Sequence, residues 1–193
     1  NFYYHKTLDR LNSFYQTHEI IDSTEIINNS KSPSLKILLS KIDWEKLADG
    51  SPTRIHGDFH FENILWTKDK KFRYIDWRQD FSGIIEYGDI YYDLAKLYHG
   101  IIVDHGAIRK NMFNVNISES KKIIDFEIYR KQTSDDIEKL FITFLRKNKY
   151  SLYKVRVLTA LIYLNIATLH HQPYSVFLYY LGKDMLNKII NEK

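Results

Sequence analysis

The stretch that most constrains this chain is residues 54–78, which read RIHGDFHFENILWTKDKKFRYIDWR. Its apolar residues predict two short strands, 64–66 and 72–75, with a polar connection between them. Such a hairpin has Asn63 at its beginning and Asp76 at its end. We therefore expect these two oxygen-bearing side chains to lie close together in the folded protein.

A third polar residue, Asp58, lies on the loop before the hairpin, five positions ahead of Asn63. Magnesium takes oxygen ligands, usually one or two from the protein and the rest from phosphate and water. Phosphoryl transfer from ATP depends mainly on positioning and on neutralising charge. An amide oxygen, a carboxylate and a second carboxylate to accept a hydroxyl proton are the residue types that this reaction requires.

Three motifs occur in order: HGDFHFEN at 56–63, YIDWR at 74–78 and GDIYYDLA at 88–95. Together they resemble the aminoglycoside phosphotransferase and choline kinase family of small-molecule kinases, whose pattern is HGDxxxxN, then IDW or IDF, then GDxxxDLA. The resemblance covers residues 53–97 closely and the flanking helices loosely. Two positions depart from it, because Phe61 stands where members often have proline and Glu62 where they often have glycine.

The resemblance implies a role for each motif residue. Asp58 corresponds to the catalytic base, and Asn63 and Asp76 to the magnesium ligands. His56 corresponds to a histidine that members hold against the backbone near the metal-binding aspartate. His60 lies at a position where related kinases often carry histidine or asparagine. It is a candidate for contact with phosphate, and a loop histidine with a satisfied ring is the alternative.

By the same resemblance, Asp89 and Asp93 brace the catalytic loop. The implied fold is α+β and mostly helical, the C-terminal lobe of the protein-kinase-like fold, and residues 1–193 form this lobe as a single domain. Each motif alone has an ordinary interpretation, since HGD often forms a turn and an aspartate often caps a helix. Their joint spacing favours the kinase-like fold.

A complete kinase also needs a glycine-rich loop over the phosphates and a lysine on a strand. None of the seven glycines forms GxGxxG ahead of Asp58. Gly83 and Gly88 have P-loop spacing, but Asp89 follows where a lysine is required. The chain begins at Asn1 rather than at methionine, so we expect the nucleotide-binding lobe to lie upstream.

The remaining sequence predicts helices and one inserted hairpin. The 3.6-residue periodicity and the cap residues predict helices at 2–18, 35–47, 89–104, 134–148, 151–170 and 174–190. Alternating apolar residues predict a hairpin with strands 112–117 and 124–129. The polar segment 19–33 is expected to be irregular.

Composition narrows the function further. The 193 residues contain 44% hydrophobic residues and no cysteine, which excludes disulfides and fits a reducing cytoplasm. No apolar run is long enough to span a bilayer. The net charge of +4 is scattered, so it suits an anionic ligand such as ATP and does not indicate a nucleic-acid partner.

From these observations we expect a Mg²⁺-dependent enzyme that transfers phosphate from ATP to a hydroxyl group of a small molecule. A sugar, an amino alcohol or a polysaccharide precursor is allowed as acceptor, and the net basic charge disfavours a polycation. The alternative is a pseudokinase-type module that binds a ligand or partner without catalysis. The sequence leaves the acceptor, the choice between ATP and GTP, and the oligomeric state open.

Overall fold

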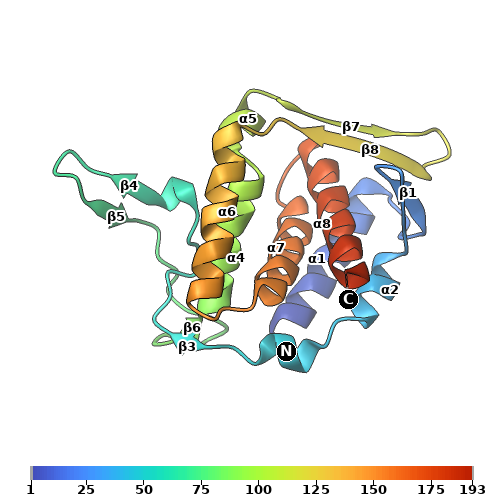
Figure 1. Cartoon of the computed structure of the whole chain (residues 1–193). Helices are drawn as coiled ribbons and strands as arrows, with labels where there is room; N and C mark the ends of the chain where they lie inside the picture. Colours follow the sequence, from blue (N-terminus) through green and yellow to red (C-terminus); the bar gives the residue numbers. More distant parts are fainter. Residues whose placement is uncertain (1, 193) are drawn as a thin grey trace.

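The computed structural model describes residues 2–192 and shows a helical body with three small sheets (Figure 1). The helices are α1 (Phe2–His18), α2 (Leu35–Ser40), α3 (Trp44–Ala48), α4 (Ile90–Ile102), α5 (His105–Arg109), α6 (Gln132–Lys147), α7 (Leu152–Ala167) and α8 (Tyr174–Asn191), with a 3₁₀ turn at Phe61–Asn63. The strands are β1 (Glu25–Ile27), β2 (Ser30–Ser32), β3 (Pro52–Thr53), β4 (Ile64–Trp66), β5 (Phe72–Tyr74), β6 (Gly88–Asp89), β7 (Phe113–Ile117) and β8 (Ile123–Ile128).

Helix α7 forms the centre of the body. It is apolar on nearly all sides, and it packs against α8, α4 and α1. A helix that is hydrophobic all round belongs in the interior, and eleven of its residues are buried. Ser151 caps its N-terminus, as the sequence predicts, by accepting a hydrogen bond from the backbone N–H of Lys154.

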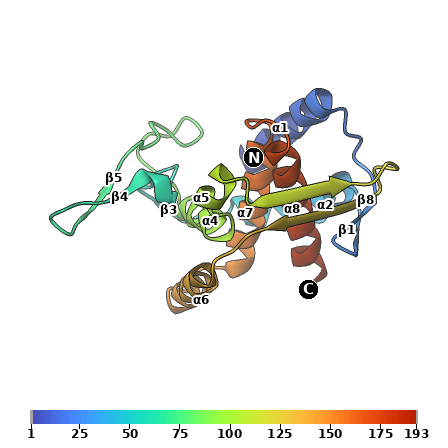
Figure 2. The ribbon, with the colours of Figure 1, turned by 90° about the horizontal axis from the view of Figure 1, so that it is seen from above.

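The inserted hairpin β7–β8 is present, and it belongs to a larger sheet than expected. The strand order of this four-stranded sheet is β2-β1-β8-β7, with β1 parallel to β8 and the other pairs antiparallel. The sheet lies across the end of α8, where Phe113 and Phe126 contact Phe177 (Figures 1 and 2). The expectation that residues 19–33 are irregular is therefore wrong for 25–27 and 30–32, which form strands because β8 supplies hydrogen-bond partners that a polar segment alone does not reveal.

Three helix boundaries also differ from the sequence predictions. The helix expected at 35–47 is two short helices, because Asp43 accepts a hydrogen bond from the backbone N–H of Lys46 and starts a new helix there. Ser134 is not the cap of α6, which begins two residues earlier at Gln132. The helix expected at 151–170 ends at Ala167, and the short helix α5 was not predicted.

The hairpin β4–β5 stands away from the helical body (Figures 1 and 2). Its register pairs Ile64 with Tyr74 and Trp66 with Phe72. Strand β3 pairs with β6, so that the segment before residues 56–63 is joined to the start of α4. Within residues 2–192, no helix combines the length and the apolar content that crossing a bilayer requires.

A buried ion cluster joins β1 to α8. Lys183 is fully buried, and its ammonium donates hydrogen bonds to the carboxylate of Glu25 and to the carbonyl oxygen of Ser23. Glu25 is only 3% exposed. Removing one member of such a pair leaves an uncompensated charge in the interior.

We predict that Lys183→Met lowers the free energy of unfolding by about 3–5 kcal/mol, because Glu25 loses its counter-charge. Urea denaturation measures this change. The control is Lys139→Met, whose ion pair with Asp136 is at the surface, and whose effect should stay below about 1 kcal/mol. Equal effects of the two substitutions would contradict the prediction.

Candidate active site

Two aspartates of helix α4 hold the HGD loop, residues 56–63, and the segment that leads into it. The carboxylate of Asp93 accepts hydrogen bonds from the backbone N–H groups of His56, at 2.6 Å, and Gly57, at 2.8 Å. Asp89 caps α4 and also accepts a hydrogen bond from the backbone N–H of Ser51 at 3.1 Å. Burial raises the pKa of Asp93, although its two backbone hydrogen bonds oppose this. Carboxylates of α4 therefore hold the backbone of this loop and of the segment before it.

Gly57 is required by the path of this loop. Its φ of +79° lies in the left-handed region that favours glycine. A Cβ at this position would lie 2.7 Å from Cβ of Arg78, which is too close for two carbon atoms. The segment after Asp76 thus packs directly on the backbone of the HGD motif.

Asp58 follows Gly57 and is partly exposed, with 29% of its side chain accessible. Its Oδ1 lies 2.7 Å from Nζ of Lys96, and its Oδ2 lies 3.4 Å from Nε2 of His60. Burial alone would raise the pKa of Asp58, but the contacts from His60 and Lys96 outweigh it and hold the pKa well below the ordinary value. Asp58 is therefore a carboxylate at neutral pH.

Asn63 is buried and tied to the same loop. Its Nδ2 donates a hydrogen bond of 2.9 Å to the carbonyl oxygen of Asp58 and lies 3.2 Å from Nε2 of His60. Because the amide nitrogen is engaged with the loop, the amide oxygen is the atom left to face a ligand.

The hairpin places Ile75, the residue before Asp76, opposite Asn63. The backbone N–H of Ile75 donates a hydrogen bond of 3.1 Å to the carbonyl oxygen of Asn63, one step beyond the last ladder pair. His56 fixes the same point, because its Nε2 donates to the carbonyl oxygen of Ile75 at 2.8 Å. Its Nδ1 accepts from the backbone N–H of Asp58 at 3.3 Å. The ring of His56 thus connects the HGD loop to the residue before Asp76.

Asp76 itself is exposed and has a φ of +56°, a left-handed conformation that aspartate tolerates better than most residues. Asn63 and Asp76 together offer an amide oxygen and a carboxylate, which are hard donors suited to Mg²⁺. Within residues 2–192 there is no cluster of three or more His, Cys, Asp or Glu arranged as a metal site. A two-ligand set is the kind that holds Mg²⁺ together with the phosphates of a nucleotide.

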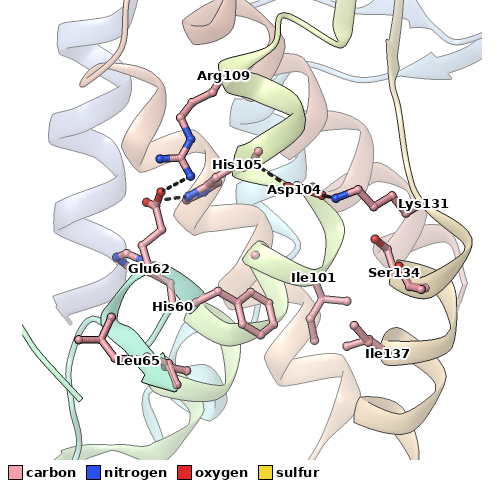
Figure 3. Close-up of a pocket in the computed structure, with 15 residues that line it drawn as sticks. His60, Glu62, Leu65, Ile101, Asp104, His105, Arg109, Lys131, Ser134 and Ile137 are labelled. Carbon is pink, nitrogen blue, oxygen red and sulfur yellow. Dashed lines mark hydrogen bonds and ion pairs between the residues drawn. The ribbon is translucent and has the colours of Figure 1, made fainter. Parts of the chain in front are cut away.

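A cleft of about 570 Å³ adjoins the catalytic loop (Figure 3). His60 lies at its wall, and Nε2 of His60 lies 3.4 Å from Oδ2 of Asp58. Apolar side chains form one part of the lining, among them Phe61, Leu65, Ile101 and Ile137. Phe61 packs against Gly100, where a Cβ would approach its ring to 3.0 Å.

The carboxylates that line this cleft are paired with cations (Figure 3). Glu62 contacts Nδ1 of His105 at 3.0 Å and the guanidinium of Arg109 at 3.2 Å. Asp104 contacts Nζ of Lys131 at 2.8 Å. The hydrogen bond from His105 is the main reason that the pKa of Glu62 is lowered, and the one from Lys131 has the same effect on the pKa of Asp104. The charges in the cleft therefore balance.

Two residues near Asp58 were missed by the sequence analysis. Lys96 is buried in an apolar part of α4, three positions after Asp93, and this spacing puts both residues on one helix face. The sequence did contain a signal for Lys96, namely a lysine on the apolar face of the helix that carries the GDIYYDLA motif. His99 lies one turn further on, and burial lowers its pKa to about 3, so its ring is neutral at pH 7.

We predict that Asp93→Ala loosens the catalytic loop, because two buried backbone N–H groups lose their acceptor, at a cost of about 3 kcal/mol. Hydrogen exchange at the amides of His56 and Gly57 should become faster. The control is Asp43→Ala, which removes a remote helix cap, costs about 1 kcal/mol and leaves these two amides protected. Unchanged exchange in Asp93→Ala would count against the prediction.

Comparison with known proteins finds a family model that matches part of the chain. Residues 27–120 match the model of the phosphotransferase enzyme family, APH. No curated protein and no solved structure matches the chain significantly. The match includes the HGD loop, the β4–β5 hairpin and the α4 motif, which are the parts that converge at the site. Residues 27–120 of this chain are therefore similar to the phosphotransferase enzyme family.

Proposed function

We propose that this protein transfers the γ-phosphoryl group of ATP to a hydroxyl group of a small molecule. One observation carries the proposal: backbone and side-chain hydrogen bonds bring Asp58, Asn63 and the residue before Asp76 to one end of the hairpin. The family match agrees with a phosphotransferase activity. We assign residues 1–193 to the C-terminal lobe of a protein-kinase-like fold, and we expect it to act in the cytoplasm, where ATP is available.

The proposed roles follow from the contacts. Asp58 orients the acceptor hydroxyl through Oδ2 and accepts its proton as transfer proceeds. Asn63 and Asp76 would hold Mg²⁺ through the amide oxygen and the carboxylate. When bound, the ion neutralises charge on the phosphates. His56 keeps Asp76 in place through the carbonyl of Ile75. His60 is our candidate for contact with the phosphates, since its ring lies beside Asp58 and Asn63.

An exposed apolar surface indicates where the rest of the nucleotide site would form. Within residues 64–87 large apolar side chains face solvent, among them Trp66, Phe72, Tyr74, Trp77 and Ile85. A group of exposed apolar side chains within one short segment is typical of an interaction site. We propose that a nucleotide-binding lobe, which carries the glycine-rich loop and strand lysine, packs on this surface and encloses ATP against Asp76.

The cleft beside His60 is the proposed acceptor pocket. Both of its carboxylates, Glu62 and Asp104, are already paired with cations. A polycationic acceptor such as an aminoglycoside would need free carboxylates, so the cleft favours a neutral or anionic hydroxyl compound. Its apolar wall suits the carbon face of a sugar ring or of a similar compact alcohol.

A second candidate function is a binding module without catalysis. The observation that favours it is the ion pair from Lys96, which occupies one oxygen of Asp58. The other oxygen, Oδ2, is not held by Lys96, and for this reason we prefer the enzyme. The assay described next distinguishes the two.

We predict that the full-length protein transfers labelled phosphate from MgATP to at least one compound in a panel of sugars, amino alcohols and sugar phosphates. Asp58→Asn should lower the rate at least about 10²-fold, because the hydroxyl proton loses its acceptor. ATP binding, measured by calorimetry, should persist in this variant. Removal of Mg²⁺ with EDTA should stop transfer.

The control for this substitution is Asp69→Asn, which changes an exposed carboxylate on the β4–β5 turn and should leave turnover intact. Full turnover by Asp58→Asn would refute the role of Asp58. ATP binding without transfer to any compound of the panel would favour the binding module.

We predict that Ile137→Trp raises KM for the acceptor without changing KM for ATP, because the larger side chain fills the cleft. Leu140→Trp is the matched control, since Leu140 is 69% exposed on the same helix and does not line the cleft. Steady-state kinetics with the acceptor found in the panel measure both constants. Equal effects of the two substitutions would place the acceptor elsewhere.

A further inference from the structure

Lys96 is a buried cation that neither the motifs nor the family match assigns to the site. It is 8% exposed, and its Nζ lies 2.7 Å from Oδ1 of Asp58. A lysine is rarely buried to this extent unless it is paired, because its charge is strongly hydrated in water. Its burial therefore depends on the carboxylate beside it.

The surroundings of Lys96 show why a cation is needed there. Asp58 belongs to the HGD loop and Asp93 binds the backbone of that loop, and the negative charge of Asp58 contributes to the raised pKa of Asp93. Lys96 comes from the same helix as Asp93, three positions later. One helix thus supplies the carboxylate that holds the loop backbone and the ammonium that offsets the loop carboxylate.

The two oxygens of Asp58 have different surroundings. Oδ1 is shielded from solvent and faces Lys96. The side chain is nevertheless 29% exposed, and Oδ2 lies 3.4 Å from Nε2 of His60, a residue that lines the cleft. The pairing with Lys96 therefore distinguishes one oxygen from the other and leaves Oδ2 beside His60.

We propose that Lys96 is a positioning residue, which fixes Oδ1 of Asp58 so that Oδ2 points at the acceptor hydroxyl. This inference depends on the proposed function, in which Asp58 receives that hydroxyl. A charged contact is stronger and shorter than a neutral one, so it restricts the carboxylate more tightly. Misplacement of a reacting group by about 1 Å can cost about 10²-fold in rate.

Kinetics of three variants of the full-length protein test the proposal. Lys96→Met removes the charge and keeps most of the volume, whereas Lys96→Arg keeps the charge. Lys154→Met is the matched control, because Lys154 is also 8% exposed but donates to the carbonyl of Asp49, away from Asp58. The assay uses MgATP and the acceptor identified in the panel.

We expect Lys96→Met to lower kcat by about 10²-fold while KM for MgATP changes by less than about twofold, because the lost interaction orients the reacting group and does not bind ATP. Lys96→Arg should recover at least about a tenth of the wild-type kcat, and Lys154→Met should retain it. A kcat for Lys96→Met equal to that of the wild type would overturn the proposal. So would an equal loss in Lys154→Met.

A second measurement separates charge from packing, and it uses the absence of cysteine from these 193 residues. Lys96→Cys can be alkylated in the unfolded state with 2-bromoethylamine, which rebuilds a lysine-like side chain, or with 1-bromopropane, which builds a neutral one of similar length. We expect refolded protein to regain kcat only with the amine. Equal recovery with both reagents would show that Lys96 only fills space.

A crystal structure of Lys96→Met gives a readout that does not depend on turnover. We expect Oδ1 of Asp58 to leave its wild-type position by about 1 Å or more, because its ionic partner is gone. An unmoved carboxylate would overturn the positioning role even if the wild-type protein is an active kinase. A displaced carboxylate in a protein that transfers no phosphate would support the positioning role and contradict the proposed function.

Discussion

The site depends on the hydrogen bonds that the carboxylate of Asp93 accepts from the backbone of the HGD loop. Two N–H groups in succession, those of His56 and Gly57, donate to one carboxylate, and this fixes the direction in which the chain leaves the loop. Hydrogen bonds to a charged acceptor are about twice as strong as neutral ones, so the arrangement is stiff. Asp58 is the next residue, so its backbone position is set by helix α4, which carries Asp93.

From that anchor the remaining contacts follow in sequence. His56 uses one ring nitrogen to hold the backbone of Asp58 and the other to hold Ile75. Asn63 bonds to the carbonyl of Asp58 and pairs through its own carbonyl with Ile75. The loop and the two ends of the hairpin thus form a closed set of hydrogen bonds, in which each proposed site residue is positioned by a neighbour that is also part of the site.

The sequence predicted those parts of the molecule that local chemistry determines. The helices at 2–18 and 89–104 and the hairpin after Asn63 follow from periodicity, from caps and from a polar turn, and the structure contains each of them. The prediction of one helix at 35–47 was wrong because Asp43 caps a second, separate helix. Periodicity alone does not reveal this break. The strands β1 and β2 were missed because their pairing depends on β8, about a hundred residues away.

The same contrast between local features and features that depend on distant contacts applies to the site. The spacing of Asp58, Asn63 and Asp76 could be read directly, because a motif records residues that act together. Lys96 could not be recognised in this way, since its importance comes from a contact between helix α4 and the loop. The pairing of Glu62 with Arg109 and of Asp104 with Lys131, which sets the charge of the cleft, likewise exists only in three dimensions.

The site lies at a boundary between a buried and an exposed part of the molecule. Asn63 and His56 are about 5% exposed or less, whereas Asp76 and much of the β4–β5 hairpin face solvent. The proposed ligand set thus has one member fixed in the body and one at the end of a projecting hairpin. Because side chains alternate along a strand, a register shift of one residue would turn the hairpin over and separate the two oxygens. The hydrogen bonds of Ile75 with Asn63 and His56 are therefore the contacts that would allow an exposed hairpin to carry half of the proposed metal site.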